Sequence, residues 1–121
     1  MRAALALLAA CGGARPAPAP APPPPPATGW MDDGVVERAL LARKGALEGC
    51  YAKQLELRPG IGGKVVVSFR IGPAGGVQSA TAAGFDRAVD ACLEGILRTL
   101  DVPAPHGGPV DVTYPLLFGD P

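Results

Sequence analysis

The sequence has no excess of charge of either sign and only one histidine. It contains 11 basic and 11 acidic residues, so its formal net charge is +0. Nucleic-acid-binding domains usually carry a basic patch or stripe, and anionic lipids attract polybasic segments, so both kinds of partner are disfavoured. The single histidine, His106, and the widely spaced cysteines do not match the ligand spacing of a zinc site. We therefore expect no nucleic acid, no metal and no cofactor.

Residue groupings typical of enzymes are also lacking. His106 lies in a loop rich in proline and glycine, Ser68 and Ser79 have no base close in sequence, and most carboxylates fall on polar helix faces. The glycine-rich stretch 72–76 joins two predicted strands and opens no helix, so it is not a phosphate-binding loop. We expect a non-catalytic protein with no small-molecule substrate.

The chain does contain one unbroken apolar run, at its N-terminus. Arg2 is followed by residues 3–10, all alanine or leucine, and then by Cys11. The run is far too short for a transmembrane helix, which needs ~20 apolar residues, and has the length of a signal-peptide core. It resembles a bacterial lipoprotein signal peptide over residues 1–10, which implies lipidation of Cys11 and a membrane anchor through acyl chains. The alternative is a chance apolar N-terminus on a cytosolic protein.

The same resemblance implies a location. A lipoprotein of this kind lies on the periplasmic side of the cell envelope, an oxidising compartment in which disulfides form. Gly12, directly after the cysteine, resembles lipoproteins that are sent to the outer membrane. We therefore expect a lipid-anchored envelope protein at the outer membrane. The apolar stretch before Cys11 is shorter than usual, which leaves a start further upstream open.

A proline- and alanine-rich segment follows over residues 11–29. Proline fixes φ and lacks an N–H donor, so this segment is neither helix nor sheet interior. We expect polyproline II, a semi-rigid spacer of roughly 50 Å at full extension, which would hold a domain of residues 30–121 off the membrane. A ligand for a proline-binding domain is the alternative.

The rest of the chain alternates between helical and strand periodicity. The predicted elements are, in order, a helix from about residue 36 to 55, a strand over 65–71, a strand over 77–82, a helix from about 85 to 100 and a strand over 110–118. Asp32 or Asp33 is expected to cap the first helix by accepting backbone N–H bonds, and Asp86 lies where the second helix begins.

This order of elements predicts an α+β fold. A right-handed crossover from the second strand through the second helix places the third strand beyond the first. The predicted sheet has three strands, antiparallel throughout, in the order 2-1-3, and both helices cover one face. Pro115 agrees with this order, because proline within a sheet lies at an edge and the third strand is an edge.

Two cysteines lie within the predicted domain, Cys50 and Cys92. Each falls on the apolar side of its predicted helix, so the two are expected to meet. A disulfide between them would stabilise the domain by about 4 kcal/mol in the chain-entropy model, a large share for a domain of this size. Two buried free thiols are the alternative.

A series of motifs along the domain resembles one known family. It comprises Cys50-Tyr51, the stretch 59–67 (PGIGGKVVV), the turn 71–77 (IGPAGGV), Ala91-Cys92 and the stretch 102–115 (VPAPHGGPVDVTYP). Together these resemble the TonB-like C-terminal domain of the AgmX/PglI type, frequent in myxobacterial proteins, over about residues 35–118. The resemblance implies a non-catalytic periplasmic module of envelope machinery, with motility, transport or envelope assembly as its setting, and a cysteine pair at Cys50 and Cys92. Val102, where the family often has an aromatic residue, and the short link at Ala83-Gly84 depart from the family pattern.

The predicted fold leaves a sheet edge free, which favours binding of an envelope protein by strand addition. The expected binding edge is the second strand, which consists of Val77, Gln78, Ser79, Ala80, Thr81 and Ala82. That strand is short and has no proline, whereas Pro115 blunts the other edge. A purely structural lipoprotein subunit of an envelope complex is the alternative, and a small enzyme or metal protein is least favoured.

Overall fold

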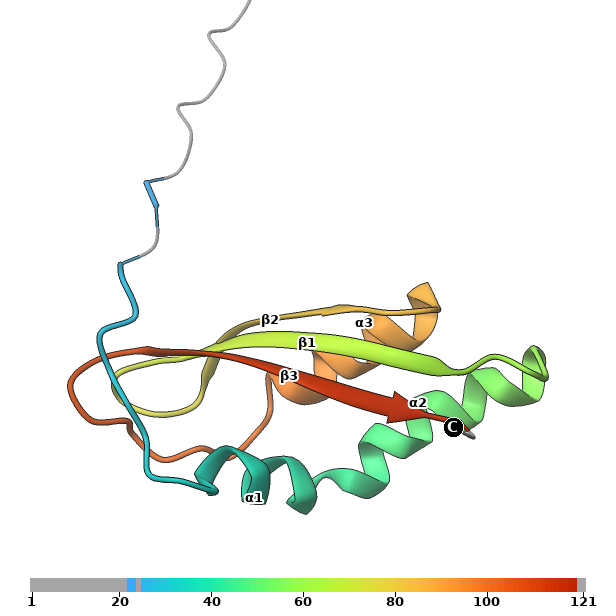
Figure 1. The fold of residues 1–121 in the computed structure, drawn as a ribbon, viewed down its shortest axis with the longest axis horizontal. Coiled ribbons are helices and arrows are strands. Elements are labelled where there is room, and N and C mark those ends of the chain that lie inside the picture. The colour runs from blue at the N-terminus through green and yellow to red at the C-terminus, as the bar shows by residue number, and fades with distance from the viewer. Residues whose placement is uncertain (1–21, 24, 120–121) are drawn as a thin grey trace, which may run out of the picture.

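The computed structural model describes residues 22–23 and 25–119. The predicted signal peptide of residues 1–10, the predicted lipidation site Cys11 and the linker up to residue 21 lie outside the described residues. The elements are, in chain order, α1 (Val35–Ala42), α2 (Lys44–Leu57), β1 (Gly63–Ile71), β2 (Val77–Ala83), α3 (Arg87–Leu97) and β3 (Val110–Phe118) (Figure 1). Within the described part of the chain, none of these helices has the length and apolar character needed to cross a membrane.

The three strands form one antiparallel sheet in the order β2-β1-β3, which confirms the predicted α+β topology. β1 is the central strand, and its Phe69 lies opposite Ala80 of β2 and Val112 of β3. The tight turn between β1 and β2 depends on Gly75 and Gly76, whose φ angles of 93° and 77° fall in the left-handed region.

The core lies between one face of this sheet and the helices. Alternate residues of β1 point toward the helices and are almost fully buried, as period-two alternation predicts. α3 packs on β2 and on α2, and its apolar side fills the space above the sheet. The buried side chains with no measurable exposure are Val65, Val67, Ile71, Val89, Leu93 and Leu97.

The first helical segment differs from the prediction, because it is two helices rather than one. Arg43 interrupts it with φ −112° and ψ 16°, and its backbone N–H donates to Leu40 at 3.0 Å. Gly45 lies two residues further on, and glycine is a poor helix former, so little opposes a break at this point. The break lets α2 run in a different direction from α1 (Figure 1).

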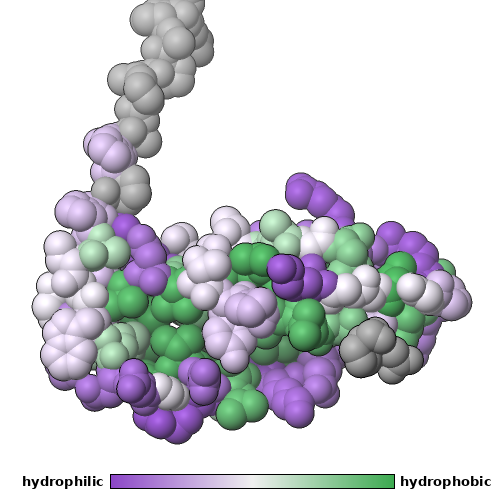
Figure 2. Space-filling view, in the orientation of Figure 1, coloured by the Kyte–Doolittle hydropathy of each residue, from purple (hydrophilic) through white to green (hydrophobic). Residues whose placement is uncertain are grey.

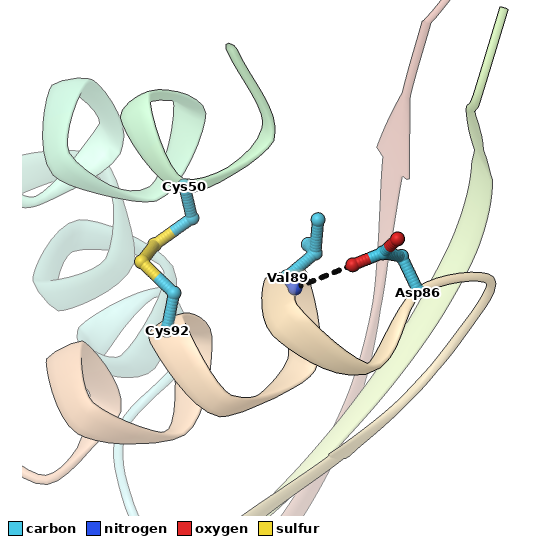
Figure 3. The surroundings of a disulfide bond; sticks show 4 residues. All are labelled: Cys50, Asp86, Val89 and Cys92. Atoms are coloured by element: carbon cyan, nitrogen blue, oxygen red, sulfur yellow. Dashed lines mark hydrogen bonds between the residues drawn. A yellow bond between two sulfur atoms is a disulfide. The ribbon is translucent and has the colours of Figure 1, made fainter. Parts of the chain in front are cut away.

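The two predicted helix starts also have different outcomes. Neither Asp32 nor Asp33 caps α1; Gly34 takes the N-cap position with φ 82° and makes no side-chain cap, so that prediction is wrong. The main-chain carbonyl of Asp32 accepts from Val35 N–H instead, at 3.3 Å. At α3 the Asp86 carboxylate accepts from Val89 N–H at 2.9 Å, as an N-cap should (Figure 3).

A disulfide joins α2 to α3. The Cα atoms of Cys50 and Cys92 are 5.7 Å apart, within the usual range for a bridge, so the predicted pairing is confirmed (Figure 3). Cys50 is buried, but Cys92 is exposed, so only one of the two lies on the buried side of its helix. The bridge fixes α3, and with it the cover over β2, to the rest of the helical layer.

Candidate binding site at the sheet edges

The direction of each backbone N–H at the sheet edges follows from a single contact. Ala82 N–H donates to the Glu94 carboxylate of α3 at 2.8 Å, so it points away from β1. In an antiparallel pair the hydrogen-bonding direction alternates from one residue to the next. The outward residues of β2 are therefore Ala80 and Ala82, whereas the N–H groups of Ser79 and Thr81 face β1.

The β2 edge, the predicted binding edge, is partly covered by α3. Besides Glu94 on Ala82, the Asp90 carboxylate accepts from Gly84 N–H at 3.2 Å. Near its beginning the strand carries a bulge, where the register with β1 shifts at Ile71. By the same alternation the N–H of Ala80 also points outward, and Ala80 is a buried residue. The structure thus places the predicted residues at an edge, and their role in binding stays a prediction.

The β3 edge has a different character. The same alternation, carried across β1, makes Asp111, Thr113, Pro115 and Leu117 the outward residues of β3. Pro115 fits this assignment, because its missing donor then costs the β1–β3 ladder nothing. All four residues are exposed, and among the described residues no acceptor meets the amides of Asp111, Thr113 and Leu117.

An apolar groove runs beside this open edge. It lies between β3 and the α1–α2 segment and has a volume of about 300 Å³. Leu41 and Leu117, which line it, are 65% and 78% exposed. Figure 2 shows hydrophobic side chains gathered between α1 and β3 on this face. The residues that line the groove are Glu37, Leu40, Leu41, Lys44, Leu47, Glu48, Tyr114, Leu116, Leu117 and Phe118.

The charges at this groove lie at its rim. Glu37, Lys44 and Glu48 come from the helices, and Lys44 lies 3.8 Å from Glu48 as an exposed i,i+4 pair. Such a pair adds little to stability because solvent screens it. The groove therefore offers an apolar floor bounded on one side by backbone donors and on the other by a charged rim.

An ion pair marks the outer face of the sheet near the start of β3. Arg70 donates to both carboxylate oxygens of Asp111, at 2.6 and 3.0 Å. This hydrogen bonding lowers the pKa of Asp111 and raises that of Arg70. The bidentate pair fixes the guanidinium in place, so that its remaining donor can hold another group.

Other residues singled out in the sequence are placed as follows. Ser68 and Ser79 lie on the outer sheet face. His106 was expected to be a solvated turn residue; it is half exposed, but it stacks on Trp30 with ring centroids 4.2 Å apart. Within the described residues no three histidine, cysteine or acidic side chains are grouped so that they could hold a metal ion. The groove itself was missed, since residues from two helices and a strand meet there only in the folded chain.

The chain was also compared with known proteins. No family model, no curated protein and no solved structure matches it.

Proposed function

We propose that this protein is a non-catalytic lipoprotein of the cell envelope, anchored through Cys11, whose TonB-like domain binds a protein partner by strand addition. The anchor and the TonB-like assignment rest on the sequence motifs. The binding mode rests on one structural observation: the β3 edge presents unpaired backbone groups directly beside an apolar groove. Strand addition uses both features, since main-chain bonds supply affinity and pockets for alternate side chains supply specificity.

The groove defines the kind of segment that fits. An extended strand beside β3 would place every second side chain on the helix side of the sheet. Those side chains would lie next to Tyr114 and Leu116 and should be apolar. The intervening side chains would lie on the outer face beside Thr113 and Leu117. The partner is therefore an extended segment with alternating apolar residues, on a protein of the same compartment.

Site-specific photo-crosslinking tests this proposal in cells. A photoreactive residue at Leu117 would lie at the β3 edge beside the groove, one at Thr81, exposed on β2, would test the predicted β2 edge, and one at Lys53, exposed on α2, is the matched control. We expect a crosslink from Leu117 to one extended segment of an envelope protein and none from Lys53. Crosslinks from Thr81 alone would move the site to β2. Equal crosslinking from all three positions would favour a structural subunit packed on many sides.

A further inference from the structure

The last residues of the proline-rich segment are attached to the domain by hydrogen bonds. Trp30 and His106 exchange two backbone bonds, at 2.8 and 2.9 Å, as an isolated antiparallel bridge. Gly29 N–H donates to the Pro109 carbonyl at 2.9 Å, and the Thr28 hydroxyl donates to the Gly107 carbonyl at 2.9 Å. Residues 28–30 thus pair with the loop directly before β3.

The packing at this bridge is very close. A Cβ atom on Gly29 would lie 1.9 Å from the Gly108 carbonyl oxygen, and one on Gly108 would lie 2.3 Å from the Thr28 hydroxyl. Neither distance is sterically possible, so both positions require glycine for the two segments to approach. This fit, together with the stacking of Trp30 on His106, distinguishes residues 28–30 from a spacer that merely leaves the domain.

The attached segment lies on the open edge of the sheet. Pro109 lies two residues before Asp111, so by the alternation along the strand its carbonyl also points outward. This carbonyl accepts from Gly29 N–H. Further along, Arg70 donates to the Pro25 carbonyl at 2.5 Å while it holds Asp111. Figure 1 shows the described N-terminal residues leaving the molecule at the end of the sheet where β3 begins. Residues 25–30 therefore run beside the edge from the level of His106 to that of Asp111.

We propose that residues 25–30 form a strap that occupies the beginning of the β3 edge and competes there with the partner strand. This inference rests on the proposed function of that edge. Among the described residues no strap N–H donates to the outward carbonyl of Asp111, and Pro25 and Pro26 have no N–H groups that could extend the pairing further along the edge. A partner strand with ordinary residues can pair along the whole edge, which makes the strap displaceable. While the strap is in place, residues 113–117 of the β3 edge are available to the partner. Release of the strap also makes residues 109–111 available and lengthens the tether.

Amide hydrogen exchange on the full chain, without any partner, tests the strap itself. Gly29→Val removes the close approach to Gly108, and Gly45→Ala, a helical position with open space, is the matched control. We expect the amides of residue 29, Trp30 and His106, which are the amides that the strap's backbone bonds hold, to exchange at least roughly tenfold faster in Gly29→Val, with Leu117 unchanged. Thr28→Val, which removes the hydroxyl bond but keeps the side-chain shape, should change the same amides in the same direction.

Two results would overturn the strap. Faster exchange at Trp30 and His106 with no change at residue 29 would show that the segment is attached but does not cover the outward carbonyl of Pro109. No change at any of the three in either variant would show that it is not attached. A missing crosslink at Leu117 would count against the proposed function alone, because the exchange experiment needs no partner. With a partner present, Gly29→Val should raise the crosslinking yield at Leu117 severalfold relative to Gly45→Ala.

Discussion

β2 and β3 are both edge strands of the same sheet, but α3 packs against only one of them. On β2, a carboxylate of α3 takes an outward N–H at Ala82, and a bulge disturbs the start of the strand. On β3, proline removes one donor, and the other outward donors meet no acceptor in the described chain. The same sheet thus has one edge covered by its own helix and one edge accessible to another chain.

The difference shows how a small protein manages unpaired edges. An exposed edge is a hazard for aggregation, and proteins blunt it with charges, bulges, proline or a covering element. β2 carries a bulge and a cover, whereas β3 carries one proline and, in our proposal, a displaceable strap. A cover fixed by a disulfide suits an edge that must stay closed, and a removable one suits an edge that must open.

The largest expected effect comes from breaking the bridge that fixes the cover on β2. The double change Cys50→Ala and Cys92→Ala should lower the free energy of unfolding by about 2–5 kcal/mol, because the unfolded chain loses its cross-link. Chemical denaturation measures this directly. The exchange rate of the Ala82 amide should also rise, since α3 is then held by packing alone. Wild-type protein under reducing conditions is the control and should behave as the double variant does.

The β3 edge can be tested separately from stability. Thr113→Pro removes an outward donor without touching the β1–β3 ladder, and Thr113→Val keeps that donor while changing a side chain of similar shape. We expect Thr113→Pro to weaken partner binding roughly 5- to 30-fold, which corresponds to about 1–2 kcal/mol, and Thr113→Val to have little effect. Titration of the crosslinked partner segment as a peptide gives both affinities. Equal affinities would exclude main-chain pairing at this position.

The sequence predicted the sheet more fully than either edge. Alternation in β1 and β3, the glycine-rich turn and the right-handed crossover are local or general rules, and they were sufficient for the order β2-β1-β3. The break at Arg43 was not predictable from spacing, since Leu40 and Leu47 are a heptad apart and suit one helix or two. The cover on β2 depends on where Glu94 points, and the groove depends on how α1 packs beside β3. Both are tertiary facts without a local pattern.

Removing the Glu94 acceptor from the β2 edge should lower the stability of the protein less than removing the disulfide. Glu94→Ala leaves the partly buried Ala82 N–H without its acceptor, which should cost about 1 kcal/mol of stability. Glu94→Gln retains a side-chain oxygen that can accept and should cost less. Thermal denaturation ranks the two variants, and sedimentation shows whether the uncovered edge associates. If Glu94→Ala stays monomeric and binds nothing new, freeing the Ala82 N–H is not sufficient to open that edge.

The smallest effect concerns the ion pair beside the β3 edge. Hydrogen bonding to Arg70 lowers the pKa of Asp111 below its ordinary value of 3.8, while partial desolvation opposes the shift. A depressed folded-state pKa means that the pair stabilises the folded chain above the ordinary value, and that this contribution is lost as the pH falls through the lowered one. Other carboxylates titrate in the same range, so the useful quantity is the difference in stability between wild type and Asp111→Asn. That difference should be small at about pH 6 and should shrink further toward about pH 3. The protection of the Trp30 amide, which is its exchange rate relative to the intrinsic rate at each pH, should fall in wild type over the same interval, because a less firmly held Arg70 also loses the Pro25 carbonyl. If the difference in stability between wild type and Asp111→Asn stays constant across this range, the ion pair does not hold the strap. The bridge between Trp30 and His106 is then its principal attachment.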